Sequence, residues 1–71
     1  MPLLIRLNGE RYEIEFIAHP YTINDLLQKL NISPDGVAVE VNLNIIKKIN
    51  YNKVLLNEDD SVEIVNFVGG G

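Results

Sequence analysis

The sequence predicts an α+β fold, a mixed sheet of about four to five strands packed on one main helix. Several segments alternate apolar and polar residues with the two-residue period of a strand. A single segment carries apolar residues at the spacing of a helix face. The apolar fraction of 46% is ordinary for a globular chain, and one helix on one face of a sheet lets a single core serve all 71 residues.

The first expected element is a β-hairpin made of Leu3–Asn8 and Arg11–Ile17. Apolar residues alternate along both strands, at Leu3, Ile5 and Leu7 and then at Tyr12, Ile14 and Phe16. Between the strands stands Asn8-Gly9, and both residues tolerate the positive φ angles that a type I′ turn requires. The pair therefore predicts a tight hairpin.

One helix is expected over Thr22–Leu30, after His19-Pro20 ends the second strand. Thr22 can cap the helix, and Asp25 stands at the position that completes a capping box. Asn31 can adopt the left-handed conformation that ends a helix. The apolar face consists of Ile23, Leu26, Leu27 and Leu30.

Four segments are expected after the helix and the turn Ser33–Gly36. They are a strand over Val37–Asn42, a short apolar piece Ile45-Ile46, a short strand Val54–Leu56 and a final strand Ser61–Phe67. The asparagine-rich region Ile49–Lys53 indicates no particular element. Because the final strand follows a long return, it can lie beside the first strand. That is the β-grasp, or ubiquitin-like, arrangement, with one domain over residues 1–67 and a flexible tail over residues 68–71.

Composition excludes several classes of function. The chain has no cysteine, which excludes disulfides, thiolate metal sites and cysteine nucleophiles. Its net charge of −4 argues against nucleic acid, whose phosphates are bound by clustered Lys and Arg side chains. No apolar run approaches the length of a membrane span, and the first residues lack the pattern of a secretory signal. We therefore expect a cytoplasmic protein that is a monomer when free and binds no metal.

The ionisable residues offer no convincing catalytic site. His19 is the single histidine and has neither a nucleophile to activate nor a second metal ligand nearby in the sequence. Glu13 and Glu15, and the acidic turn Glu58–Asp60, are expected to be solvated surface groups. The acidic turn can still help to dock a basic partner. An enzyme is accordingly the least favoured class.

The end of the last strand allows two interpretations. Val62 and Ile64 are expected to face the core, and the same alternation turns Asn66 inward and Val65 and Phe67 outward. Either a bulge shifts the register near the strand end, or Val65 and Phe67 form an apolar surface beside the tail.

The chain ends in three glycines, Gly69, Gly70 and Gly71, directly after an apolar segment. A frayed terminus or a glycine linker is the simplest explanation of this composition. Glycine also lets a backbone pass through a narrow channel without a Cβ clash, and it leaves a terminal carboxylate accessible to attack. Since the other candidates for chemistry are weak, the carboxylate of Gly71 is the best functional candidate.

The chain resembles the β-grasp sulfur carriers, most closely the ThiS-type carriers of thiamine biosynthesis. The resemblance covers nearly the whole chain, and its segments are Leu7–Glu10, Asp25–Leu27, Val37–Asn42, Asp60–Val65 and the ending Phe67-Val68-Gly69-Gly70-Gly71. The chain departs from many relatives at Lys47-Lys48, where they carry a proline-arginine pair.

This resemblance implies a mechanism in which the chain is a protein substrate. An E1-like adenylyltransferase of the ThiF type would use ATP and Mg²⁺ to convert the carboxylate of Gly71 into an acyl-adenylate. A persulfide on a partner protein would supply sulfur, and the resulting thiocarboxylate would donate it to a thiazole synthase of the ThiG type. The chain itself would hold no cofactor. Gly69 and Gly70 would thread into partners, and the candidates for partner contact are Val65, Phe67 and Val68.

Other functions remain open at this point. Within the same chemistry, the chain could serve molybdopterin synthesis or tRNA thiolation. From other classes, a ubiquitin-like modifier would form isopeptide bonds with lysines, and a plain binding module would carry an inert tail.

Overall fold

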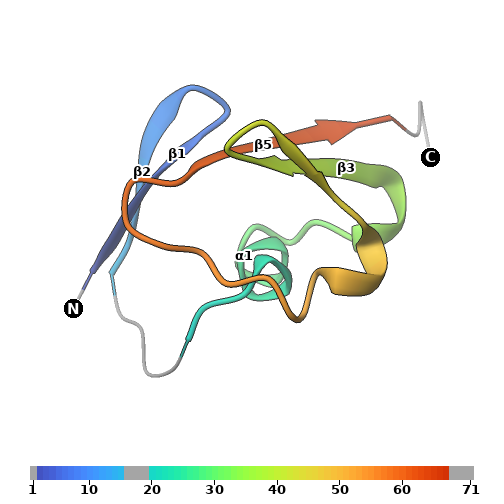
Figure 1. Ribbon diagram of the computed structural model, residues 1–71, viewed down its shortest axis with the longest axis horizontal. Helices are drawn as coiled ribbons and strands as arrows, with labels where there is room; N and C mark the ends of the chain where they lie inside the picture. Colours follow the sequence, from blue (N-terminus) through green and yellow to red (C-terminus); the bar gives the residue numbers. More distant parts are fainter. Residues whose placement is uncertain (1, 16–19, 68–71) are drawn as a thin grey trace.

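A mixed sheet and one helix form two layers (Figure 1). The structure, a computed structural model, describes residues 2–15 and 20–67. In chain order, the elements are β1 (Leu3–Leu7), β2 (Glu10–Ile14), α1 (Ile23–Lys29), the short 3₁₀ helix η1 (Pro34–Gly36), β3 (Val37–Val41), β4 (Asn44–Ile46), the short 3₁₀ helix η2 (Lys48–Asn50) and β5 (Ser61–Asn66).

The last strand lies at the centre of the sheet. The strand order is β2-β1-β5-β3-β4, so β5 separates the two hairpins (Figure 1). It runs parallel to β1, with Leu7 opposite Val62, and antiparallel to β3, with Val39 opposite Ile64. The prediction that the final strand lies beside the first is confirmed, and with it the β-grasp arrangement.

Both hairpins turn on asparagine. Asn8 and Gly9 have φ angles of 50° and 85°, which confirms the predicted turn between β1 and β2. Asn42 and Leu43 have φ angles of 52° and 71° and connect β3 to β4 in the same number of residues. The apolar piece that contains Ile45 is therefore a strand of the sheet. The part of the second predicted strand beyond residue 15 lies outside the described residues.

The helix begins and ends as its sequence predicts. The amide of Asp25 donates to Thr22 Oγ1 at 3.1 Å, and the amide of Thr22 donates to Asp25 Oδ2 at 2.9 Å. This reciprocal capping box satisfies two amides that the helix itself leaves without partners. Asn31 has a φ angle of 60°, the left-handed conformation expected at the helix end.

The predicted strand Val54–Leu56 is wrong. This segment makes one isolated antiparallel bridge, between Thr22 and Leu55, and runs beside the start of α1 rather than in the sheet. The amide of Leu56 donates to the carbonyl of Tyr21 at 2.8 Å. The pairing does not continue as a strand ladder because the chain enters α1 at residue 23, but the amides of Ile23 and Asn24 still donate to the carbonyls of Val54 and Tyr51, at 3.2 and 2.8 Å.

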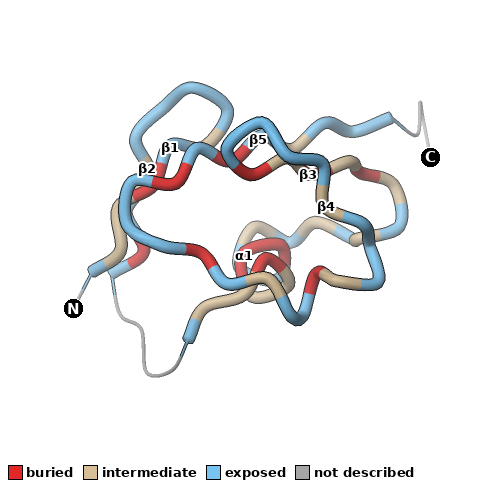
Figure 2. The backbone as a smooth tube through the Cα atoms, viewed as in Figure 1, coloured by how far each residue is buried: buried red, intermediate tan, exposed pale blue. Residues whose placement is uncertain are grey.

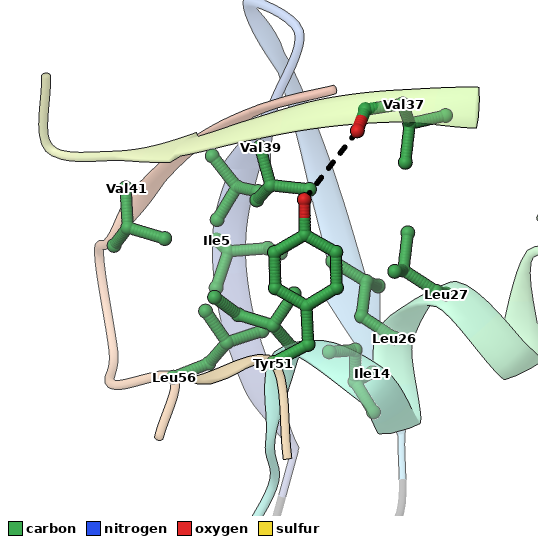
Figure 3. Close-up of a cluster of buried hydrophobic side chains, with 11 residues drawn as sticks. Ile5, Ile14, Leu26, Leu27, Val37, Val39, Val41, Tyr51 and Leu56 are labelled. Carbon is green, nitrogen blue, oxygen red and sulfur yellow. Dashed lines mark hydrogen bonds between the residues drawn. The ribbon is translucent and has the colours of Figure 1, made fainter. Parts of the chain in front are cut away.

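The core lies between the sheet and α1 (Figures 2 and 3). Its buried side chains are Ile5, Ile14, Ile23, Leu26, Leu27, Val37, Val39, Val41, Tyr51, Leu56 and Val62. Complete burial of each large aliphatic side chain stabilises the fold by about 1.5–3 kcal/mol. Tyr51 comes from the region without a predicted element. Its ring lies against the core, and its hydroxyl donates to the carbonyl of Val37 at 3.5 Å (Figure 3).

Candidate docking face at the end of the last strand

The register of β5 decides how its end is oriented. From Val62 to Asn66, each residue has one partner on β3, ending with Ala38 opposite Val65 and Val37 opposite Asn66. A bulge would place two residues opposite one, so this stretch has none. Val65 and Phe67 are 55% and 64% exposed, so the interpretation without a bulge holds for these two side chains. Asn66, which the same alternation was expected to turn inward, is exposed as well.

An apolar patch includes these two side chains. Val65, Ala38 and Ile45 lie on the sheet face away from α1, because their neighbours along each strand face the core. Val65 and Ala38 are direct cross-strand neighbours, and Ala38, Ile45 and Phe67 line one open groove. Ile45 is 75% exposed. We define the apolar patch as Ala38, Ile45, Val65 and Phe67. Adjoining exposed apolar side chains of this kind are typical of protein-binding surfaces.

Two members of the apolar patch were not identified as site residues from the sequence. Ala38 belongs to the predicted strand Val37–Asn42 and Ile45 to the short apolar piece Ile45-Ile46, and the sequence indicates no site role for either segment. A signal was present for Ile45, because adjacent strand residues point to opposite faces and only one residue of Ile45-Ile46 can pack on the core. The structure assigns that place to Ile46, which packs against the buried cluster.

Acidic side chains adjoin the patch. Glu40 stands opposite Ile45 on one side and opposite Glu63 on the other. Two carboxylates directly across a strand pair repel one another, so a cation from a partner would relieve this contact. At the other side of the groove, Lys48 forms an ion pair with Asp35.

The end of β5 is held from both sides. On the β3 side, the amide of Phe67 donates to the carbonyl of Gly36 at 3.0 Å. On the β1 side, Asn8 Oδ1 accepts from the amide of Ile64 at 2.8 Å, and Asn8 Nδ2 donates to the carbonyl of Ile64 at 3.3 Å. The chain therefore arrives at residue 67 along a fixed strand.

The tail itself is not described. Val68, Gly69, Gly70 and Gly71 lie outside the described residues. The assignments of Gly71 as the carrier site and of Gly69 and Gly70 as the threading residues therefore stay predictions, and so do the boundary of the tail and the contact role of Val68.

The acidic turn is more structural than the sequence indicates. Asp60 was expected to be solvated, yet it is 9% exposed. Its carboxylate accepts from Asn42 Nδ2 and from the amide of Asn57, both at 2.8 Å, and so fixes the loop before β5. Glu58 also has a backbone partner, because its Oε1 accepts from the amide of Leu4 at 3.0 Å. Asp60 is thus a buried anchor and is unsuited to contact a partner.

The other ionisable groups considered from the sequence form no catalytic or metal-binding cluster among the described residues. Glu13 and Glu15 are exposed as expected, and His19 lies outside the described residues. Within residues 2–15 and 20–67, no group of three or more His, Asp or Glu side chains could hold a metal ion. No helix in those ranges is long and apolar enough to cross a membrane.

One tyrosine has a perturbed ionisation. Burial raises the pKa of the Tyr21 hydroxyl, and the negative charge of Asp25 raises it further. Both residues lie at the start of α1 and take part in its local structure, where the hydroxyl donates to the carbonyl of Asp25 at 3.4 Å. The raised pKa therefore reflects packing at the helix start. Tyr21 is not a member of the apolar patch, whose four side chains carry no ionisable group.

Comparisons with a family model and with a curated relative point to the same family. The model of the ThiS family matches residues 5–71, which includes the terminal glycines. The sulfur carrier protein ThiS of Bacillus subtilis is 40% identical over 68 residues, covering 96% of this chain and 100% of that protein.

Two longer relatives bear a different name. A thiazole synthase of Magnetococcus marinus is 42% identical over 67 residues, and one of Paramagnetospirillum magneticum is 45% identical over 65 residues. The matches cover 94% and 92% of this chain but 20% and 19% of those proteins, so the chain spans about one fifth of their length.

Solved structures share the fold. The crystal structure of the thiamine biosynthesis protein ThiS from Geobacter metallireducens has a TM-score of 0.82 and 24% identity, covering 97% of this chain and 100% of that one. A solution structure of a thiamine biosynthesis protein from the same organism has a TM-score of 0.80 and 24% identity, covering 97% of this chain and 88% of that one.

Proposed function

The chain belongs to the ThiS family, and from this premise we propose that it is a sulfur carrier of thiamine biosynthesis whose carrier site is the carboxylate of Gly71. The observation that carries the proposal is a family match that extends through the last residue. The relative from Bacillus subtilis, which is named a sulfur carrier protein and is matched over its full length, supports it.

The proposed chemistry begins by activating a poor electrophile. A carboxylate oxygen of Gly71 attacks the α-phosphorus of ATP, the bond to pyrophosphate breaks, and an acyl-adenylate forms. An E1-like adenylyltransferase of the ThiF type carries out this step with Mg²⁺, which balances charge on the phosphates. The carbonyl carbon now bears a good leaving group.

Sulfur then replaces one oxygen. The terminal sulfur of a partner's persulfide attacks the carbonyl carbon, and AMP leaves with the former carboxylate oxygen. A partner thiolate then attacks the cysteine sulfur of this acyl persulfide, and the sulfur–sulfur bond breaks. The thiolate is oxidised as it forms a disulfide with that cysteine, the transferred sulfur is reduced, and it leaves as the thiocarboxylate of Gly71. Its sulfur is the nucleophile that a thiazole synthase would take up.

In this proposal, catalysis belongs to the partners. The chain has no cysteine, so a covalently carried sulfur has to reside elsewhere, and the terminal carboxylate suits this role. The match to part of two proteins named thiazole synthase favours an enzyme of that kind as the sulfur acceptor. ATP and Mg²⁺ belong to the activating enzyme, and the carrier holds no cofactor of its own.

We further propose that the apolar patch docks the activating enzyme. The patch is exposed and includes Phe67, which directly precedes the tail. Binding there would bring the carboxylate of Gly71 near the active site of the enzyme. The reaction between two molecules would then proceed as a step within one complex. Glu40 and Glu63 favour a partner surface that carries basic side chains beside an apolar centre.

The decisive experiment is intact mass spectrometry after incubation with ATP, Mg²⁺, a ThiF-type adenylyltransferase and a persulfide donor. We expect the mass to rise by the difference between a sulfur and an oxygen atom. A variant that lacks Gly70 and Gly71 is expected to fold and to gain no sulfur.

Unchanged mass would contradict the proposal if the same enzyme mixture loads the Bacillus subtilis carrier. Sulfur gained by the truncated variant would show that the carboxylate of Gly71 is not the carrier site. Protein–lysine adducts in a cell extract would favour a ubiquitin-like modifier. Transfer to a purified thiazole synthase then distinguishes the thiamine pathway from molybdopterin synthesis or tRNA thiolation.

A further inference from the structure

Two asparagines hold the backbone of β5, one near each end. Asn42 donates its amide to the carbonyl of Ser61 at 2.7 Å, and its Oδ1 accepts from the amide of Ser61 at 2.9 Å. Asn8 donates its amide to the carbonyl of Val62 at 2.9 Å, and its side chain bonds both backbone groups of Ile64. In each case a carboxamide stands in for the backbone of a neighbouring strand.

The turn conformation alone does not require these carboxamides. Asn8 and Asn42 have φ angles of 50° and 52°, a region that glycine adopts without steric cost. A glycine at either position would keep the turn and remove the side-chain bonds to β5. The contribution of each carboxamide to β5 can therefore be separated from its contribution to the hairpin.

The position of Asn8 gives its carboxamide a particular consequence. The pairing of β1 with β5 ends at Leu7 opposite Val62, while β3 continues to pair with β5 as far as Asn66. The carboxamide of Asn8 extends the β1 side of the ladder to Ile64. Val65 and Phe67 follow immediately and belong to the apolar patch.

We propose that Asn8 is a positioning residue for the carrier's docking and transfer steps. Its carboxamide holds the end of β5, so that Val65 and Phe67 keep their place in the apolar patch and the chain reaches Phe67 in a fixed position. The docking part of this inference rests on the proposed function. The effect on the strand itself does not, so the two can fail separately.

The first test needs no partner. Amide hydrogen exchange is measured by NMR on the full chain, the Asn8→Gly variant and the Asn42→Gly variant. In Asn8→Gly we expect exchange of the Phe67 amide to become about two- to ten-fold faster, the range that corresponds to the net free energy of one hydrogen bond. Asn42→Gly loses the bond from the amide of Ser61 at the start of β5 and also the bond to Asp60 Oδ1. Its Phe67 amide, at the other end of β5, is expected to exchange as in the unmodified chain.

An unchanged Phe67 amide in Asn8→Gly would overturn the inference, and so would equal acceleration in both variants. If Asn8→Gly did not fold, both glycine variants would be compared in a stabilising osmolyte such as sucrose, which favours the compact state. Exchange at Phe67 that is unchanged in the folded Asn8→Gly variant under those conditions would then overturn it.

The second test measures binding to the ThiF-type adenylyltransferase in a double-mutant cycle. We expect Asn8→Gly and Phe67→Ala to be non-additive, because Phe67 contributes less once the strand end is loose. Asn42→Gly and Phe67→Ala are expected to be additive. Because Asn42→Gly also removes the bond to the buried carboxylate of Asp60, it controls for a general loss of stability, and additivity in both cycles would overturn the positioning role. If the unmodified chain neither bound the enzyme nor gained sulfur, the proposed function would fail, while the exchange experiment would still decide the effect on β5.

Discussion

At the scale of single residues, Phe67 combines a side chain that faces solvent with a backbone amide held by a hydrogen bond. It is 64% exposed, and its backbone is fixed, because its amide bonds the carbonyl of Gly36. Aromatic side chains are enriched at protein interfaces because they bury a large area and lose few rotamers on binding. A rigid, exposed aromatic residue beside Ile45 is well suited to anchor a partner.

The first prediction concerns this side chain. We expect Phe67→Ala to weaken binding to the activating enzyme by at least about 1 kcal/mol, the scale of an interface residue that matters for affinity. The free energy of unfolding should change by less than about 0.5 kcal/mol, as for other surface substitutions. Isothermal titration calorimetry measures the first quantity and urea unfolding the second.

Leu55→Ala provides the matched control, since Leu55 is also exposed but lies beside the start of α1 rather than on the apolar patch. It is expected to leave binding unchanged. Equal loss of affinity in the two variants would contradict the role of the patch. A large loss of stability in Phe67→Ala would instead show that Phe67 packs within the fold.

At the scale of elements, α1 depends on its caps because it is short. A helix of seven residues is too short to be stable alone, so packing and capping maintain it. Ile23, Leu26 and Leu27 bury one face completely, and Thr22 and Asp25 satisfy each other's backbone amides through their side chains.

The second prediction is that Thr22→Ala lowers the free energy of unfolding by about 1 kcal/mol, the usual cost of losing a cap of this kind. Ser33→Ala is the control. Its hydroxyl accepts from the amide of Asp35 at 3.3 Å but caps only the three residues of η1, so a smaller loss is expected. Urea unfolding of both variants measures the difference. A Ser33→Ala loss as large as that of Thr22→Ala would argue against a special role for the capping box.

The elements that could be predicted from the sequence carry their own local signals. Asn8-Gly9 predicted the first hairpin, and Thr22 with Asp25 predicted the helix start. The alternation of apolar and polar residues predicted β3. The segment Val54–Leu56 was misassigned because its apolar residues have strand character, while strand formation depends on a partner that local sequence does not reveal.

The candidate site was predictable in part. The sequence allowed either a bulge or the exposure of Val65 and Phe67. Only the continuous pairing of β5 with β3 decides between these two interpretations. Ala38 and Ile45 could not be added from the sequence because their proximity to Phe67 depends on the order of the strands. The buried role of Asp60 was missed for the same reason, since its partner Asn42 lies 18 residues away, in the turn between β3 and β4.

At the scale of the whole molecule, charge determines how partners approach. The net charge is −4, and Glu40 and Glu63 lie next to one another on the sheet face that carries the apolar patch. Such a surface attracts a basic partner electrostatically, and added salt screens this attraction and shortens its range.

The third prediction is that the association rate constant with the activating enzyme falls as salt is added, while the dissociation rate constant changes little. Stopped-flow measurements over a range of salt concentrations would show this. Glu63→Gln should reduce the salt dependence of association, whereas Phe67→Ala should mainly accelerate dissociation. Association that does not depend on salt would contradict electrostatic steering.

The central place of β5 has a consequence for the synthesis of the protein. The strands of the two hairpins leave the ribosome before β5, which lies between them in the finished sheet. Each hairpin can pair locally, but the two have no shared partner until β5 has been made. Ala38 and Ile45 therefore meet Val65 and Phe67 only in a completed molecule. An unfinished or incompletely folded copy lacks the assembled apolar patch, so a partner that binds this patch selects finished carriers.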